Sequence, residues 1–279
     1  MSYNPEIPKN RYDNYGDREW TRLEKDGHGE LLYHVHFDIL KRYIRQNDKV
    51  LEIGAGSGRY TKDIVKMCKE LTVGDISTHQ IEFNKSKMKE LSLFEKIKDF
   101  YVLDMLDMGI FEDSSFDCIV CIGGVINYLL DKEKDGINEM LRVLKPEGIL
   151  IVGAMSFIGA SLYYLDGIKY EKDQFGIEAT KWVFNTGIQD EEHYPVPSKH
   201  YVHMMRSSEM DALFSDFPIT VKEKSSAGLF SQAGDSALEN ARQDKEFWKL
   251  IIEKEIAFTK MQGTLDCGMN LIYVLEKNN

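Results

Sequence analysis

The stretch that decides the fold is VLEIGAGSGRYT, Val50 to Thr61. It starts with the strand-like run VLEI, and glycine then occupies every second position at Gly54, Gly56 and Gly58. Glycine loses more conformational freedom on folding than any other residue, so it is favoured where the backbone needs a special conformation or a close approach. A buried strand followed by this turn predicts a ligand site at residues 54–58.

Strands and helices alternate through the central part of the chain. Five apolar segments read as buried strands, and they lie in KVLEI, ELTVGDIS, DFYVLDM, SFDCIVCIGG and GILIVGAM. Strands that are apolar almost throughout and alternate with helices are typical of a parallel sheet covered on both faces. The sequence therefore predicts an α/β fold with a doubly wound, mostly parallel sheet.

The chain divides into four segments by pattern. Residues 1–47 read as an N-terminal helical cover, and residues 48–155 carry the α/β core. Residues 156–206 break the alternation with nine aromatic residues and several glycine and proline breaks, which predicts an inserted cap. Residues 207–279 then complete the sheet, with a long helix expected over about 236–260.

Composition limits the classes of partner. The net charge of −11 argues against a nucleic-acid partner, since binding to phosphates depends on Lys and Arg. No apolar run approaches the roughly 18 residues of a membrane span, and the N-terminus lacks a signal-peptide core. Four cysteines do not form a disulfide framework, so a reduced, cytoplasmic protein is expected. Cys118 and Cys121 lie in a predicted strand, where positions three apart face opposite sides.

Acidic residues end two further strands, and the glycine turn lacks two common phosphate signatures. The dinucleotide pattern G-x-G-x-x-G would need glycine where Arg59 stands, and no P-loop lysine follows. Asp75 ends the second strand, where an acid can accept the hydroxyls of a ribose. Asp104 ends the third, beside Met105, a pair suited to the amine and the ring face of adenine. Together the three strand ends predict an adenosine site.

These motifs resemble those of the class I S-adenosylmethionine-dependent methyltransferases of small molecules. The resemblance rests on VLEIGAGSGRYT, LTVGDIS, VLDMLDM, SFDCIVCIGGVINYL and MLRVLKPEGILIV. It implies a Rossmann-like, seven-stranded sheet whose last strand is antiparallel, with N-terminal helices and an inserted cap. It also implies the cofactor S-adenosyl-L-methionine.

The resemblance implies specific cofactor contacts. Gly54 and Gly56 would border the methionine moiety, Asp75 would hold the ribose, Asp104 with Met105 would hold adenine, and Glu52 would steady the loop from below. Further contacts are expected from Ala55, Ile76 and Ile122. The N/D-P-P-Y run of amino-group methyltransferases is absent, since Ile122-Gly123-Gly124-Val125 stands in its place.

The N-terminal segment resembles the helices that cover the cofactor in small-molecule members. It carries Tyr12, Tyr15 and Trp20 before the sheet begins. Arg22, in the run Glu19-Trp20-Thr21-Arg22-Leu23, is a candidate partner for the methionine carboxylate. A role as a solvated helix residue is an open alternative for Arg22.

Candidate catalytic residues lie in the aromatic cap. Methyl transfer needs a base only if the acceptor arrives protonated, and His193, His200 and His203 are the candidates, with His200 and His203 preferred. The H-x-x-H spacing also resembles a metal pair, but no third ligand accompanies it, so no metal is expected. The expected reaction is methylation of oxygen or nitrogen in a small organic acceptor. The alternatives are a nicotinamide-dependent oxidoreductase and a catalytically silent cofactor-binding module, and no oligomeric state is predicted.

Overall fold

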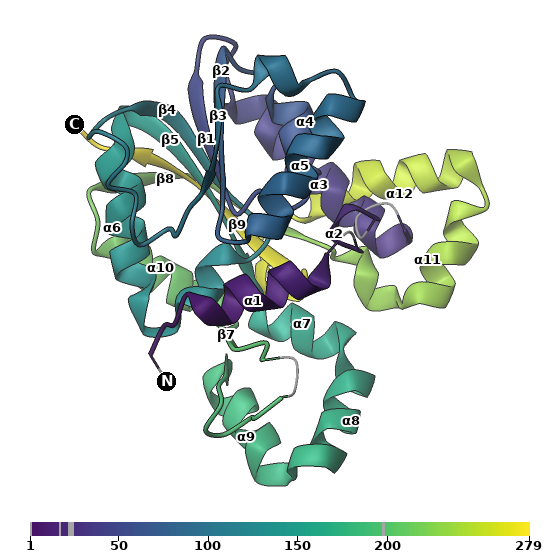
Figure 1. Cartoon of the computed structure of the whole chain (residues 1–279). Helices are drawn as coiled ribbons and strands as arrows, with labels where there is room; N and C mark the ends of the chain where they lie inside the picture. Colours follow the sequence, from purple (N-terminus) through teal and green to yellow (C-terminus); the bar gives the residue numbers. More distant parts are fainter. Residues whose placement is uncertain (1, 17, 22–24, 197–198) are drawn as a thin grey trace.

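The computed structural model describes residues 2–16, 18–21, 25–196 and 199–279. Its centre is a seven-stranded sheet flanked by helices (Figure 1). The strands of this sheet are β1 (Lys49–Ile53), β2 (Glu70–Asp75), β3 (Asp99–Val102), β4 (Phe116–Cys121), β5 (Leu144–Met155), β8 (Ile219–Ala227) and β9 (Asn270–Lys277).

The sheet has the strand order β3-β2-β1-β4-β5-β9-β8. The first five of these strands are parallel, and β9 is antiparallel to both of its neighbours. The chain runs outward from β1 to β3 and then returns to β4 beside β1. This reversal places the carboxyl ends of β1 and β4 at the switch point where open α/β sheets bind ligands. The predicted doubly wound, seven-stranded sheet with an antiparallel last strand is confirmed.

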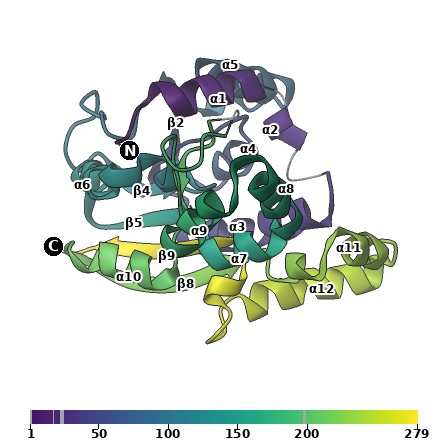
Figure 2. The ribbon, with the colours of Figure 1, turned by 90° about the horizontal axis from the view of Figure 1, so that it is seen from below.

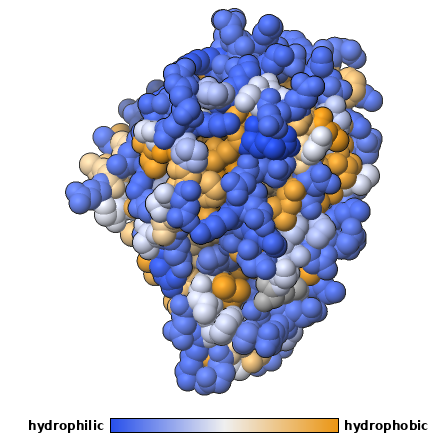
Figure 3. Space-filling view, turned by 90° about the vertical axis from the view of Figure 1, so that its left-hand side faces the viewer, coloured by the Kyte–Doolittle hydropathy of each residue, from blue (hydrophilic) through white to orange (hydrophobic). Residues whose placement is uncertain are grey.

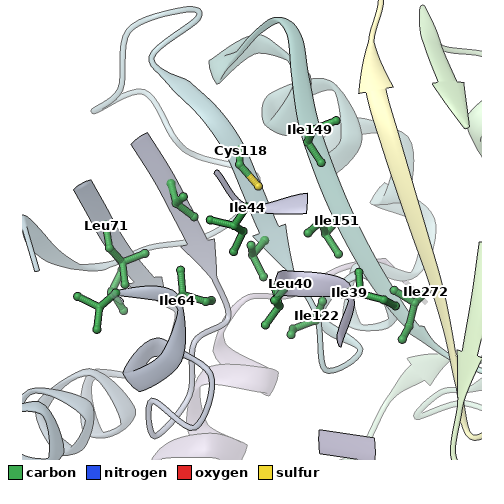
Figure 4. Packing of buried hydrophobic residues seen from close by; sticks show 14 of the residues in the cluster. Ile39, Leu40, Ile44, Ile64, Leu71, Cys118, Ile122, Ile149, Ile151 and Ile272 are labelled. Atoms are coloured by element: carbon green, nitrogen blue, oxygen red, sulfur yellow. The ribbon is translucent and has the colours of Figure 1, made fainter. Parts of the chain in front are cut away.

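Helices cover both faces of the sheet. One face packs against α3 (Gly27–Tyr43), α4 (Thr61–Ile64) and α5 (Thr78–Glu90), and Figure 4 shows Ile39, Leu40 and Ile44 meeting strand side chains there. The other face packs against α6 (Glu133–Val143) and α10 (Ser207–Ser215). Cys118 belongs to the first core and Cys121 to the second, so the two thiols face opposite sides as predicted.

Side-chain caps fix where several helices begin. Asp26 accepts a hydrogen bond from the Gly29 amide at 2.8 Å and starts α3, and Ser77 accepts one from Gln80 at 3.1 Å and starts α5. The helix expected over 236–260 is two helices, α11 (Asp235–Arg242) and α12 (Lys245–Phe258). Asp244 interrupts them because its carboxylate accepts the first amides of α12.

The N-terminal segment and the cap lie at the carboxyl ends of the parallel strands. The N-terminal segment contains α1 (Glu6–Tyr15) and α2 (Arg18–Thr21), and α1 lies beside α5 in both ribbon views (Figures 1 and 2). The cap consists of α7 (Phe157–Tyr163), α8 (Leu165–Phe175), α9 (Ile177–Thr186) and a small hairpin of β6 (Ile188–Gln189) and β7 (Val202–His203).

The surface is mostly hydrophilic on the face shown in Figure 3, with hydrophobic residues exposed in several areas. This agrees with the high content of charged residues. Among the described residues, no helix combines the length and apolarity needed to cross a bilayer.

Candidate cofactor-binding site

A cavity lies at the switch point, between the sheet and the N-terminal helices. It has an empty volume of about 1000 Å³, counting the solvent at its mouth. The sheet contributes the ends of β1, β2 and β4, and the N-terminal segment contributes a cover. The lining residues are Tyr3, Pro8, Tyr12, Glu19, Glu52, Ile53, Gly54, Ala55, Gly56, Ser57, Arg59, Tyr60, Asp75, Ile76, Leu103, Met105, Ile122, Gly123, Val125, Tyr128 and Leu129.

The glycine turn forms one wall of this cavity. Gly54, Gly56 and Gly58 all have positive φ angles, of 68°, 52° and 92°. A Cβ at Gly54 would lie 2.2 Å from Val125, and one at Gly58 would lie 2.5 Å from Asn84. Packing within the chain therefore requires two of the three glycines. A Cβ at Gly56 would meet no described atom closer than the Glu19 side chain at 3.4 Å, so the space beside this residue is free of close packing and can take a ligand.

Asp75 connects the end of β2 to the glycine turn. Its Oδ2 accepts from the Gly56 amide and its Oδ1 from the Ser77 amide, both at 2.8 Å. Burial raises the pKa of this carboxyl to about 6, although the two amides act in the opposite direction. A carboxylate oxygen has two acceptor sites, so Asp75 keeps capacity for the hydroxyl donors of a ribose.

Glu52 is buried beneath the turn, where 2% of its surface is exposed. Its Oε2 accepts a 2.6 Å hydrogen bond from the Thr61 hydroxyl, at the start of α4. Burial raises the pKa of Glu52 to about 8. Glu52 therefore joins β1 to the segment after the turn.

The adenine end of the predicted site differs from expectation at Asp104. Its Oδ1 accepts from the Tyr3 hydroxyl at 3.0 Å and from the Leu106 amide at 2.9 Å. Asp104 is not among the residues that line the cavity, whereas Tyr3, Ile76, Leu103 and Met105 are. The structure thus places Tyr3, which the sequence did not indicate, between Asp104 and the cavity.

The N-terminal segment closes the cavity through Pro8, Tyr12 and Glu19. Helix α1 is held in place because Asp13 accepts from the Ser77 hydroxyl at 2.5 Å, and Gln80 donates to the Gly16 carbonyl at 3.0 Å. Trp20 stacks with the Arg59 guanidinium, whose centre lies 5.0 Å from the ring. Arg22 lies outside the described residues.

A second cavity opens under the cap, next to the first. It has an empty volume of about 1100 Å³, counting the solvent at its mouth, and is bordered by α7, α8, α9 and the cap hairpin, with Arg11 of α1 also in its wall. Tyr128 and His200 separate the two cavities: Tyr128 lines the first and His200 the second. The Tyr128 hydroxyl lies 2.9 Å from the Tyr12 hydroxyl and 2.9 Å from Nε2 of His200. The sequence did not indicate that Tyr128 belongs to the site; its only mark in the sequence is that it is an aromatic residue shortly after β4.

The three candidate histidines have different surroundings. Burial, with Arg11 nearby, lowers the pKa of His200 to about 3, so its imidazole is neutral across the physiological range. His203 bonds through Nδ1 to Glu133 at 2.8 Å, and His193 stacks on Trp182 and contacts Asp190. Neither His203 nor His193 lines either of these two cavities, and no group of three or more metal-ligating residues occurs in the described part of the chain.

Comparison with known proteins identifies the central segment. Residues 51–152 match the family model described as a methyltransferase domain. The chain is 31% identical over 131 residues to the ubiquinone/menaquinone biosynthesis C-methyltransferase UbiE of Haemophilus ducreyi, covering 44% of this chain and 49% of that protein. The chain thus spans about half the length of the curated relatives it matches.

Solved structures share the fold over nearly the whole chain. The N-methyltransferase NodS of Bradyrhizobium japonicum, in complex with S-adenosyl-L-homocysteine, matches with a TM-score of 0.59 at 17% identity, covering 98% of this chain and 100% of that one. A Haloferax volcanii methyltransferase, solved in complex with the activator Trm112, matches with a TM-score of 0.58 at 18% identity, covering 96% and 98%. Residues 51–152 of this chain therefore match a methyltransferase domain, and the fold around them is that of solved methyltransferases.

Proposed function

We propose that this protein transfers the methyl group of S-adenosylmethionine to a small organic acceptor, on oxygen or nitrogen. The observation that supports this proposal most directly is the pair of adjacent cavities. One is lined by the family's cofactor motifs, and the other is bordered by the aromatic cap. An enclosed, mostly apolar cavity with a few polar groups is the usual form of a small-molecule site.

The residues of the first cavity fit S-adenosylmethionine. Gly56 leaves space for the amino-acid moiety because it has no side chain, Asp75 has acceptor capacity for the ribose, and Ile76, Leu103 and Met105 form an apolar wall for adenine. When bound, the cofactor supplies an electrophilic methyl group on a sulfonium. The chain's own task is then to align the acceptor with that methyl and to exclude water.

Several residues would carry out that alignment. Tyr12 and Pro8 of α1 cover the first cavity and exclude water from it. The Tyr12–Tyr128–His200 chain forms the boundary that an acceptor must meet from the side of the cap. A neutral His200 is available as a hydrogen-bond partner, and its low pKa makes it a weak base in the absence of ligands.

We further propose that residues 1–47 act as the cofactor cover, 48–155 as the cofactor-binding core, 156–206 as the acceptor cap and 207–279 as the completion of the sheet. The four cysteines are free thiols, which supports a reducing, cytoplasmic location. The net charge of −11 supports a small-molecule acceptor over nucleic acid.

Two measurements test the proposal. Calorimetry should show binding of S-adenosylhomocysteine and no binding of NADH; the reverse result would reject the assignment in favour of a nicotinamide enzyme. A screen of metabolites with methyl-labelled S-adenosylmethionine should then label a small molecule. Binding without turnover of any acceptor would point to a silent module, and label on carbon would refute the choice of oxygen or nitrogen.

A further inference from the structure

The cap cavity is apolar along most of its wall. Side chains of Met155, Ile168, Val183 and Met204 line it. Tyr164 and Phe184 also line it, although 54% and 42% of their surfaces are exposed, so these two side chains lie at its mouth. Large exposed apolar side chains at a cavity mouth indicate an apolar ligand.

Polar groups of the cap cavity gather where it meets the cofactor cavity. Arg11 and Tyr12 are neighbours on α1, yet Arg11 lines the cap cavity and Tyr12 lines the cofactor cavity. Burial raises the pKa of Tyr128, while hydrogen bonding by Tyr12 and the charge and hydrogen bonding of Arg11 act to lower it. Arg11, Tyr12 and His200 thus converge on one phenol oxygen.

The charges at this junction distinguish between classes of acceptor. Arg11 is a permanent cation that lines the cap cavity, and His200 is neutral. The Glu19 carboxylate also acts on Tyr128, but it lines the cofactor cavity and not the cap cavity. A protonated amine at the junction would be repelled by Arg11, whereas an acidic oxygen would be attracted. The carboxylate of Glu171 also lines the cavity, but it accepts a hydrogen bond from the Tyr194 phenol, on the side of α8.

We infer that the cap cavity binds the methyl acceptor, and that this acceptor is an apolar, flat molecule with one acidic oxygen, such as a phenol, an enol or a carboxylic acid, placed against Arg11. The apolar body lies between α7 and α9, and the oxygen lies at the junction with the cofactor cavity. This inference rests on the proposed function and narrows its acceptor.

Three probes with one apolar body test the charge preference. They are 2-naphthoate (anionic), 2-naphthylmethanol (neutral) and 2-naphthylmethylammonium (cationic), titrated by calorimetry into the full chain saturated with S-adenosylhomocysteine. The naphthoate should bind most tightly. Arg11→Gln should weaken its binding roughly 10- to 100-fold, since hydrogen bonds to charged groups have this strength, and should leave the neutral probe unchanged. Arg18→Gln is the matched control, because Arg18 is exposed on α2 and lines neither cavity.

A second pair of variants tests the location. Thr180 lines the cavity from α9, so Thr180→Phe should fill it and abolish binding of all three probes. Lys181→Phe places the same side chain at the next, exposed position and should leave binding intact. Thermal melts establish that each variant is folded.

The outcomes separate this inference from the proposed function. Tightest binding of the cationic probe, an unchanged naphthoate affinity in Arg11→Gln, or unchanged binding in folded Thr180→Phe would overturn the inference. Failure of all three probes would overturn it too, while S-adenosylhomocysteine binding kept the proposed function intact. Failure of S-adenosylhomocysteine itself to bind would reject the proposed function instead.

Discussion

The hydroxyl of Tyr128 lies 2.9 Å from Nε2 of His200, across 72 residues of sequence. Tyr128 follows β4 in the core, and His200 belongs to the cap. Because burial keeps His200 neutral, its Nε2 can accept a hydrogen bond from the Tyr128 hydroxyl, and the Tyr128 oxygen can in turn accept a hydrogen bond from Tyr12 of α1. One hydroxyl therefore joins the core, the cap and the N-terminal cover.

Removal of this hydroxyl should affect the acceptor side more than the cofactor side. We expect Tyr128→Phe to lower kcat/KM for the acceptor at least tenfold, because the boundary that positions it is lost. The Kd of S-adenosylhomocysteine should change less than threefold. A double-mutant cycle with His200→Gln, measured by urea unfolding, should give a coupling energy of about 0.5–3 kcal/mol. A coupling near zero would show that the contact contributes no stability.

Asp75 should determine cofactor affinity. Asp75→Ala removes the proposed ribose acceptor and also the partner of the Gly56 and Ser77 amides. We expect S-adenosylhomocysteine to bind Asp75→Ala roughly 10- to 100-fold more weakly than the parent. The Kd of Asp75→Asn should lie between those of the parent and Asp75→Ala, because its amide oxygen still accepts a hydrogen bond. Asp99→Ala, at an exposed strand position, is the control. An unchanged Kd in folded Asp75→Ala would remove this residue from the site.

Cofactor affinity should also depend on pH through Asp75. Burial raises the pKa of this carboxyl to about 6, with the Glu19 and Asp13 carboxylates adding to the rise and the two amides opposing it. Hydroxyl donors stabilise the ionised form, so binding weakens as the pH falls below about 6. Calorimetry from pH 5 to pH 8 should show this loss, and Asp75→Asn should flatten it. An equally steep loss in Asp75→Asn would assign the titration to another group.

The sequence predicted the sheet well because its strands are nearly continuous apolar runs. Both cores and the separation of Cys118 from Cys121 follow from that pattern, whereas the antiparallel last strand was expected only from the family resemblance. The helix expected over 236–260 was too long, because helical periodicity alone does not show that Asp244 caps a new helix.

Prediction of the site was less complete, because it depends on contacts between distant segments. The glycine turn and Asp75 occur in a short local motif, so the sequence predicts them, and Gly54, Gly56 and Asp75 line the first cavity. Tyr3 and Arg11 reach the site only through the docking of α1, and no local pattern marks them. Two glycines attributed to ligand approach are also required by Val125 and Asn84, which are distant in sequence.

Glu52 should make stability depend on pH. Its pKa is raised by burial to about 8, so the folded chain binds a proton that the unfolded chain releases near pH 4.5. The stability that this bound proton contributes is fully present below about pH 4.5 and is lost as the pH rises through about 8. Glu52→Gln removes this dependence on pH, because glutamine does not ionise. At pH 8.5 the parent must bury a charged carboxylate and the variant need not. We therefore expect the variant to be more stable than the parent at pH 8.5 by a few kcal/mol, about 1.4 kcal/mol for each pKa unit. Urea unfolding at pH 5 and pH 8.5, with exposed Glu95→Gln as control, measures this; a difference that is equal at both pH values would contradict the assignment.

Glu255 should stabilise the protein without taking part in binding. It is fully buried on α12, and its carboxylate accepts hydrogen bonds from the amides of Gly228, Leu229 and Phe230 at 2.7, 2.7 and 2.9 Å. These amides form the turn after β8, so one side chain fixes that turn to the helix. Glu255→Gln replaces an acceptor oxygen with an NH₂ donor facing these amides, and we expect a loss of about 1–3 kcal/mol in the free energy of unfolding. Glu253→Gln makes the same change at an exposed position of α12 and should alter stability by less than about 0.5 kcal/mol.

Glu255 lines neither described cavity, so S-adenosylhomocysteine should bind the folded Glu255→Gln variant with an unchanged Kd. Equal stability of the two variants would show that the three amide contacts contribute nothing beyond an exposed glutamate.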